Sequence, residues 1–261
     1  MLNHLPTLDL MQYENIFIEC GNGDYVFKRK ATQLVDEIYN SSIYSRWFGL
    51  WMLNQYLFKY NLHSGNYSLI FGLYESKFLT KYFKDFEDIH KIGQMKKFGK
   101  NLLDHTILCM DSCFDILVFT GFLFNSRDVS ICGLNTFEIY EVLRFCSMFH
   151  DIGKIEQDMN HEKYSAEIAE EYLKKIYPYG FPSTQDVAIG VILSHMKPHG
   201  YGRGEKWGNN AINNFVEGCG SKGIAQLSVL MAIIDKYAST RNFRECGFLI
   251  ELYSKISNNV V

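Results

Sequence analysis

Apolar residues recur every three or four positions through most of the chain from residue 101 to residue 240, which is the spacing of helices that place one face in a core. The first such segment begins at Asn101. The second covers 136–149, and Asn135 with Glu138 three residues later forms the pattern of a capping box at its start. Three further segments follow. The first covers 161–177 and ends before Pro178, the second begins at Ser183, and the third covers 224–235. The pattern predicts a mostly α-helical domain.

The chain before residue 96 has a less regular pattern. Two short apolar stretches within 16–28 flank the turn-forming residues Gly21, Asn22 and Gly23, which predicts a β-hairpin. A glycine-rich phosphate-binding loop is the alternative, but neither a Lys-Ser/Thr pair nor a helix start follows. Further helices are expected over 32–39, 43–60 and 69–86.

Aromatic residues lie on almost every side of the predicted helix 43–60. This pattern predicts burial on more than one side, either against the following domain or against a second copy in a homo-oligomer. Stacking of nucleic-acid bases on these rings is the alternative. The residues concerned are Tyr44, Trp47, Phe48, Trp51, Tyr56, Phe58 and Tyr60.

The patterns divide the chain into three predicted parts: an N-terminal extension over 1–95, the helical domain over 96–245 and a C-terminal tail over 246–261. With 261 residues and 47% hydrophobic content, the chain can form a substantial core. Its net charge of −3 gives no field for holding a long polyanion, so extensive duplex binding is not expected. A nucleotide or a short strand end suits this charge better.

Seven cysteines without a C-x-x-C pair, and an N-terminus without a secretion signal, predict the reducing cytoplasm. Cys109 and Cys113, four residues apart, could act as thiolate ligands, but we expect them to be small buried hydrophobic residues. The most apolar run, 107–124, contains Asp111 and Asp115, and the cost of burying two carboxylates in lipid argues against a membrane span.

Histidine and aspartate residues interrupt the helical pattern at several places. In FHDIGK, residues 149–154, His150 and Asp151 offer an imidazole and a carboxylate from neighbouring positions, a pair suited to a divalent ion. Any one such residue alone is more often a hydrogen-bonded core residue. Together they predict a buried metal site, and the others are His105 in DHTILCMD, His161, His195 and Asp235 in AIIDKYAS.

This order of His, His-Asp and a distal Asp resembles the HD superfamily of metal-dependent phosphohydrolases. Five segments are similar in particular to the HD domain of bacterial CCA-adding enzymes: DHTILCMD, RFCSMFHDIGK, HEKYSAEIAEEYLKKI, LSHMKP and AIIDKYAS. The similarity covers about residues 101–240, and the chain before Leu102 lacks the signature of a nucleotidyltransferase head. The resemblance implies an HD helical bundle around a metal held by His105, His150, Asp151 and Asp235, without nucleotide-adding activity.

A divalent ion at such a site lowers the pKa of bound water and polarises a phosphoryl group. In the roles that the resemblance implies, Asp151 orients the attacking water and Lys154 offsets the negative charge of the transition state. Because the expected ligands include no thiolate, they do not select zinc strongly. Mn²⁺, Ni²⁺, Co²⁺, Fe²⁺ and Mg²⁺ are all chemically reasonable.

Two histidines decide how many ions the site holds. His161 and His195 can bind a second ion bridged through Asp151, or they can contact the substrate phosphate beside a single ion, and we expect the single ion. The polar loop 198–210 contains Arg203 and Lys206 between glycines, and it is either a substrate loop or a plain surface loop.

The sequence thus predicts hydrolysis of a phosphoester of a nucleotide or an RNA end, either a phosphomonoester or a 2′,3′-cyclic phosphodiester. Hydrolysis of dNTP, ppGpp or a cyclic dinucleotide is a lesser alternative. The alternative of another class is a non-catalytic, metal-stabilised scaffold that binds a regulatory ligand or partner.

Overall fold

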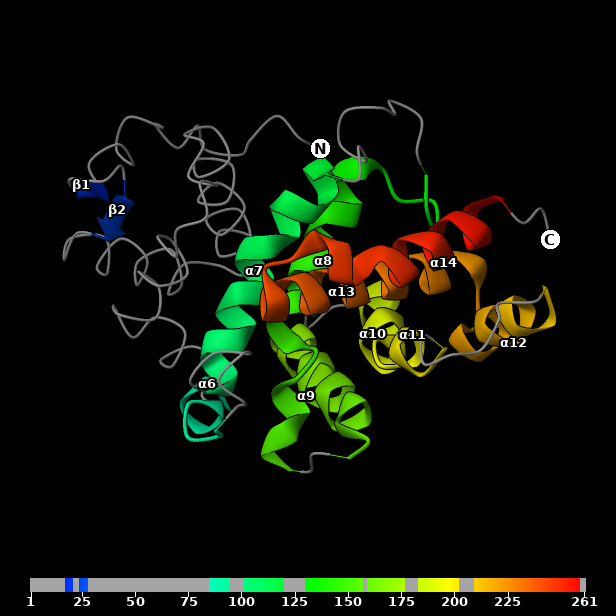
Figure 1. Cartoon of the computed structure of the whole chain (residues 1–261). Helices are drawn as coiled ribbons and strands as arrows, with labels where there is room; N and C mark the ends of the chain where they lie inside the picture. Colours follow the sequence, from blue (N-terminus) through cyan, green and yellow to red (C-terminus); the bar gives the residue numbers. More distant parts are fainter. Residues whose placement is uncertain are drawn as a thin grey trace, which may run out of the picture. The chain divides into compact units, whose positions relative to one another are not determined.

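The computed structural model describes residues 17–20, 24–27, 85–93, 101–119, 130–156, 159–176, 183–201 and 209–258. The chain divides into two compact units, Met1–Tyr82 and Phe83–Val261. Figure 1 shows the described helices of the second unit in colours that follow the sequence.

The first unit contains the predicted β-hairpin. Strands β1 (Phe17–Cys20) and β2 (Asp24–Phe27) pair in antiparallel fashion, with Phe17 opposite Phe27 and Cys20 opposite Asp24. The aromatic segment 43–60, with Trp47 and Trp51, and the helix expected over 32–39 lie outside the described residues. The prediction that the aromatic segment is buried or forms a homo-oligomer stays a prediction.

The second unit is helical, which confirms the predicted mostly α fold. Its helices, with two short 3-10 turns named η1 and η2, are α6 (Asp85–Ile89), α7 (Leu102–Phe119), α8 (Thr136–Phe149), η1 (Ile152–Ile155), α9 (His161–Ile176), α10 (Ser183–Ser194), α11 (Lys197–Tyr201), α12 (Asn209–Cys219), α13 (Lys222–Thr240), η2 (Phe243–Cys246) and α14 (Gly247–Asn258). None of the described helices is long and apolar enough to cross a membrane.

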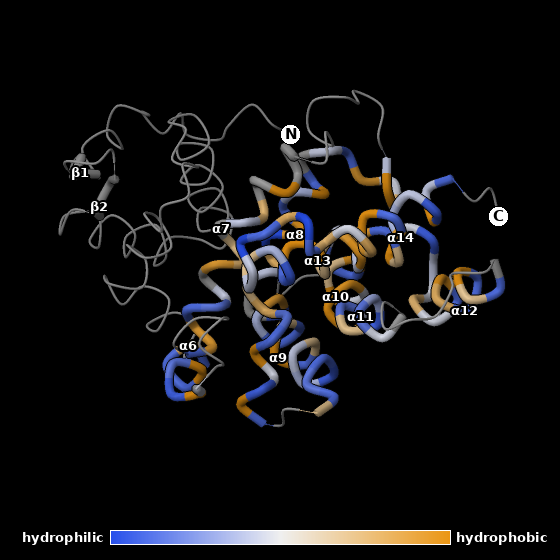
Figure 2. Tube along the Cα trace, in the orientation of Figure 1, coloured by the Kyte–Doolittle hydropathy of each residue, from blue (hydrophilic) through white to orange (hydrophobic). Residues whose placement is uncertain are grey.

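Helix α13 forms the centre of this unit. It packs against α7, α8, α10 and α14, and every residue from Leu227 to Ile234 is buried. Helix α9 packs against α10 and η1 instead, with one buried face, and Figure 2 shows apolar and polar positions alternating along it. Helices α8 and α10 pack on both α9 and α13 and so connect these two helices.

Local sequence signals set the ends of these helices. At the start of α8, the Asn135 N–H donates to Glu138 Oε2 at 2.8 Å and the Glu138 N–H donates to Asn135 Oδ1 at 3.1 Å, which confirms the predicted capping box. At the start of α13, Ser221 Oγ accepts from the Ile224 N–H at 3.2 Å. These caps therefore fix the residue at which each of the two helices begins.

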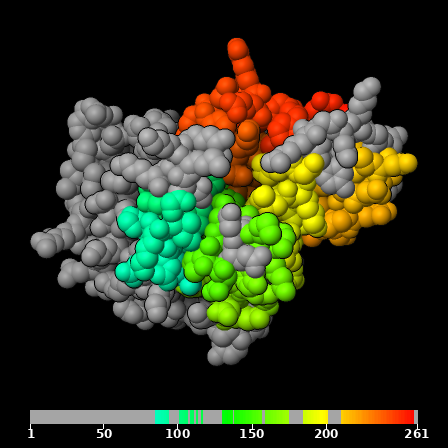
Figure 3. All heavy atoms as spheres, turned by 60° about the horizontal axis from the view of Figure 1, so that its bottom comes forward, coloured from blue at the N-terminus to red at the C-terminus, as the bar shows by residue number. Residues whose placement is uncertain are grey.

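Two segments differ from the sequence-based expectation. Residues 246–261, predicted as a tail, include α14, which packs on α13 and buries Leu249, Leu252 and Ile256 at helical spacing. Helix α6 precedes the predicted boundary at residue 96, yet Asp85 accepts a hydrogen bond from the Tyr172 hydroxyl of α9 at 2.6 Å. In Figure 3, α6 and the residues that follow α8 lie next to each other on one face. Both segments are packed parts of the second unit.

Candidate metal centre

Six predicted residues converge at one place in the second unit. His105 comes from α7, His150 and Asp151 follow α8, His161 begins α9, His195 follows α10, and Asp235 lies on α13. The four histidines and Asp151 are buried, and the Asp235 side chain is 21% exposed. Five separate stretches of chain thus bring imidazoles and carboxylates together at one nearly dry place.

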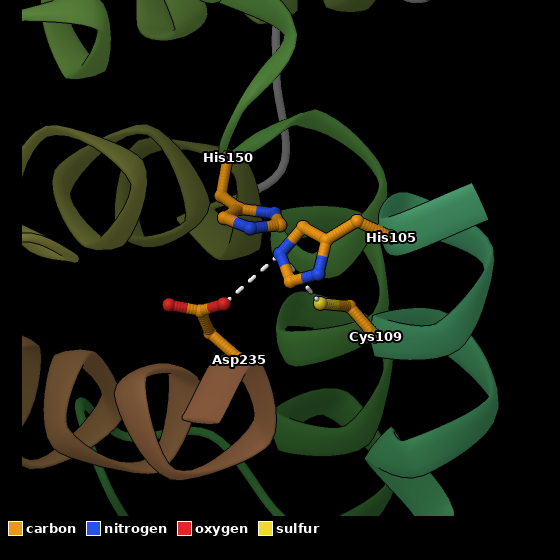
Figure 4. Close-up of side chains that lie close together, drawn as sticks. All are labelled: His105, Cys109, His150 and Asp235. Carbon is orange, nitrogen blue, oxygen red and sulfur yellow. Dashed lines mark hydrogen bonds and ion pairs between the residues drawn. The ribbon is translucent and has the colours of Figure 1, made fainter. Parts of the chain in front are cut away.

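The first group of ligand atoms belongs to His105, Cys109, His150 and Asp235, and these atoms all lie within 4.8 Å of one another. His105 Nε2 is 2.9 Å from Asp235 Oδ1 and 3.5 Å from Cys109 Sγ. Figure 4 shows His105 and Cys109 projecting from α7 toward Asp235 on α13, with His150 beside them. The group can hold a metal ion.

The second group is formed by Asp151, His161 and His195. Asp151 Oδ1 lies 2.9 Å from His161 Nε2 and 3.8 Å from His195 Nε2, and these two nitrogens are 3.3 Å apart. The other oxygen of Asp151, Oδ2, lies 3.7 Å from His105 Nε2 and 3.6 Å from His150 Nε2. Each oxygen of this one carboxylate thus faces a different group.

Hydrogen bonds to backbone carbonyls orient two of the imidazoles. His150 Nδ1 lies 3.0 Å from the Ser147 carbonyl, and His195 Nδ1 lies 2.7 Å from the Ile192 carbonyl. A carbonyl only accepts, so each Nδ1 carries the proton and each Nε2 of the neutral ring presents a lone pair. Among the described residues, the buried His150 Nε2 has no hydrogen-bond partner. A bound cation would satisfy this atom, so the residues present fit a metal ion.

Burial and neighbouring charges set the protonation of the site. Burial lowers the pKa of His150 to about 4, which keeps the ring neutral. Burial alone would raise the pKa of Asp151, but the nearby imidazoles of His150, His161 and His195 lower it well below its usual value. Asp235 is likewise held well below its usual pKa, because His105 outweighs the effect of burial. Both carboxylates are therefore ionised and available as ligands at neutral pH.

His105 behaves differently from His150. Burial alone lowers its pKa, but Cys109 and Asp235 outweigh this effect and raise the pKa well above the usual value. In the absence of metal, the ring is therefore protonated and paired with Asp235. A metal ion must displace that proton before His105 can become a ligand.

Lys154 contacts the carboxylate at the centre of the site. Its Nζ donates to Asp151 Oδ2 at 2.7 Å, and its side chain is 19% exposed. The ammonium thus lies between the solvent and the buried ligands. A phosphate that approached from the solvent would meet this cation first.

Gly153 lies where two segments of the chain approach each other closely. Among the described glycines only Gly133 and Gly220 have positive φ, so Gly153 needs no left-handed backbone. Its N–H donates to Ser165 Oγ at 2.9 Å, and an added Cβ would overlap the backbone of His161 and Ser165. Glycine is required here because η1 and α9 approach each other closely.

Two residues beside the ligands were not predicted as part of the site. His199 of α11 places Nε2 at 3.3 Å from Asp235 Oδ2, and its side chain is 23% exposed. Cys109 follows His105 by one helical turn, a spacing that puts both on one face, but it was expected, like Cys113, to be a small buried hydrophobic residue. Arg203 and Lys206, predicted for a substrate loop, lie outside the described residues.

Comparison with known families agrees with this geometry. Residues 133–240 match the HD domain family. The matched residues include His150, Asp151, His161, His195 and Asp235, and His105 precedes them. HD domains bind divalent metals and are typical of metal-dependent hydrolases. A comparison with curated proteins finds no similar protein.

Proposed function

We propose that this HD domain is a metal-dependent phosphohydrolase that acts on a phosphoester of a nucleotide or an RNA end. One observation carries the proposal. The ionised Asp151 belongs to the second group of buried ligand atoms, while its Oδ2 faces the first group and also accepts a hydrogen bond from Lys154. A carboxylate shared in this way can hold metal on both sides, and the cation beside it suits a phosphate.

The distances favour two ions over the single ion that the sequence analysis expected. Two imidazole nitrogens about 2.1 Å from a shared ion lie about 3 to 3.4 Å apart, and His161 Nε2 and His195 Nε2 are 3.3 Å apart. A second ion would fit between His105, His150 and Asp235, on the side of Asp151 Oδ2, which lies 3.7 Å from His105 Nε2. Bound divalent ions would lower the pKa of coordinated water and polarise the phosphorus.

The protein's own groups position the substrate. Lys154 donates a hydrogen bond to phosphoryl oxygens and offsets the charge that develops on them. Asp151 accepts the proton of the attacking water or orients that water. His199, the partly exposed imidazole against Asp235, holds that carboxylate in place at the solvent side.

The substrate class rests on charge and on the resemblance to the HD domain of CCA-adding enzymes. A net charge of −3 suits a small phosphoester better than a duplex. A phosphomonoester or a 2′,3′-cyclic phosphodiester is the first choice, and dNTP, ppGpp and cyclic dinucleotides come second. Arg203 and Lys206 remain predicted substrate contacts.

The test is hydrolysis of a phosphoester panel by protein stripped of metal and reloaded with Mn²⁺, Ni²⁺, Co²⁺, Fe²⁺ or Mg²⁺. The panel contains 2′,3′-cyclic nucleotides, 2′-, 3′- and 5′-nucleotides, dNTP, ppGpp and a cyclic dinucleotide, and metal content is measured in parallel. His150→Ala should lose metal and hydrolysis together, while His90→Ala, which replaces an exposed histidine, should keep both. Full metal content and activity in His150→Ala would refute the site. Metal binding without hydrolysis of any substrate would favour the scaffold function.

A further inference from the structure

Cys109 lies among the atoms of the first ligand group. Its side chain is fully buried, and its Sγ is 3.5 Å from His105 Nε2 and within 4.8 Å of the ligand atoms of His150 and Asp235. Asp151 does not belong to this group of four. The fourth potential ligand atom of this group is thus a sulfur atom (Figure 4).

We propose that Cys109 is a metal ligand, so that one ion of the centre is held by two imidazoles, one carboxylate and one thiolate. The inference rests on the proposed function only in requiring that the HD domain binds metal. It adds a ligand that the sequence motif does not contain, and it narrows the choice of metal.

The distances fit a tetrahedral ion. A sulfur about 2.3 Å and an imidazole nitrogen about 2.05 Å from a tetrahedral zinc ion lie about 3.6 Å apart, and the Cys109 Sγ to His105 Nε2 distance is 3.5 Å. The same calculation gives about 3.4 Å for nitrogen and carboxylate oxygen, and His105 Nε2 is 2.9 Å from Asp235 Oδ1. Small side-chain shifts would place all three atoms around one ion.

An independent observation also indicates a cation at this place. His150 Nε2 is buried, its lone pair is fixed by the hydrogen bond of Nδ1 to Ser147, and it has no hydrogen-bond partner among the described residues. This atom belongs to the same group of four as Cys109 Sγ. An unsatisfied buried acceptor of this kind costs free energy unless something binds it.

The remaining buried cysteines have other surroundings. Cys146 Sγ donates to the Ala188 carbonyl at 3.4 Å, and Cys246 Sγ donates to the Ile233 carbonyl at 3.8 Å. Cys113, one turn after Cys109 on α7, is also buried but belongs to neither ligand group. Among the described cysteines, Cys109 alone is within reach of the site.

A thiolate changes the metal that the site prefers. Sulfur is a soft ligand that favours Zn²⁺, Fe²⁺ and Co²⁺, whereas Mg²⁺ and Mn²⁺ prefer oxygen. When Cys109 binds the ion, its thiol proton is released to solvent. The ion bound by the first group should therefore be a borderline or soft metal.

The experiment uses the full chain, freed of metal and titrated with Co²⁺, because a cobalt–thiolate bond gives a charge-transfer band in the near ultraviolet. Wild type should show this band together with the visible d–d bands. Cys109→Ser should lose the near-ultraviolet band and keep visible cobalt bands. It should bind Zn²⁺ at least about 100-fold more weakly in chelator competition, because losing a direct ligand costs more than losing an outer-sphere partner. Cys113→Ser is the matched control, a buried cysteine of the same helix, and it should behave as wild type.

The outcomes separate this inference from the proposed function. Cobalt bound by wild type without the charge-transfer band, or with a band that survives in Cys109→Ser, refutes the thiolate ligand and leaves the metal-dependent function standing. A wild type that binds no cobalt and no zinc refutes both. X-ray absorption of zinc-loaded wild type tests the same point without a variant, because one sulfur at about 2.3 Å is expected. A shell of nitrogen and oxygen alone would overturn the inference.

Discussion

Replacing Gly153 by alanine should open one half of the metal centre and leave the other half intact. Gly153 lies in η1, where an added Cβ would overlap the carbonyl oxygen of His161 and the amide nitrogen of Ser165 and would lie 2.8 Å from Tyr164 Cβ. Two of these atoms belong to the backbone of α9, so no side-chain rotation can relieve the overlap.

The size of the effect follows from these contacts. Ordinary contact of a Cβ begins at 3.4 Å, so η1 and α9 must separate by about 1 Å, an overpacking that costs about 1 to 3 kcal/mol. The same movement stretches the 2.9 Å contact between His161 Nε2 and Asp151 Oδ1 toward about 4 Å. The first group includes no residue of η1 or α9 and keeps its geometry.

Two measurements check this prediction. Urea unfolding of the metal-free protein gives the loss of stability, and metal titration should give one tightly bound ion where two are expected for wild type. The matched control is Gly218→Ala in α12, where an added Cβ meets nothing within 4 Å. Because alanine restricts the unfolded chain, the control should be more stable by about 0.4 to 1 kcal/mol.

A Gly153→Ala protein that keeps wild-type stability and both ions would refute the account of η1 and α9. Loss of both ions with little loss of stability would show instead that the two groups do not bind independently placed ions. Loss of stability with both ions retained would show that the strain relaxes away from the site.

Three further predictions concern single side chains. Lys154→Ala should retain metal while turnover falls by about 10² or more, the scale of one lost transition-state donor; loss of the metal itself would contradict a phosphate-binding role. Because the pKa of His150 falls from 6.5 to about 4 on folding, the unfolded chain binds the extra proton between these values. The metal-free protein should therefore lose stability as pH falls from 6.5 to 4, by about 3 kcal/mol from this group, and His150→Gln should lose that part of the slope in urea unfolding. His199→Ala should weaken metal binding by about 10- to 100-fold, as expected for a residue that orients the ligand Asp235, while His199→Gln should restore part of the affinity.

The helices were predictable because their apolar positions repeat regularly, and the capping box at Asn135 and Glu138 fixed the start of α8. His150 and Asp151 could be predicted as candidate ligands because they stand side by side within a helical pattern. The α14 helix was not predicted, although Leu249, Leu252 and Ile256 repeat at helical spacing.

Residues whose role depends on a tertiary contact could not be found in this way. His199 reaches Asp235 from the five-residue helix α11, which is too short to show a period. Cys109 has the spacing of a buried hydrophobic residue, and only the position of His150 and Asp235 makes its sulfur a potential ligand. Gly153 is determined by the approach of α9, which no local pattern specifies.

Asp151 belongs to the second group, and its carboxylate also reaches His105 and His150 of the first group. An ion bound by one oxygen would fix the orientation of the other oxygen, and an ion bound by Oδ2 would displace Lys154 from it. The two binding equilibria are therefore thermodynamically linked, and each ion alters the affinity of the other by the same factor. The first ion favours binding of the second by freeing the Lys154 ammonium and by fixing the carboxylate. If these two effects outweigh the repulsion between the two cations, metal binding is cooperative. The centre then passes from empty to full over a narrow range of metal concentration, and a half-loaded protein is scarcely populated.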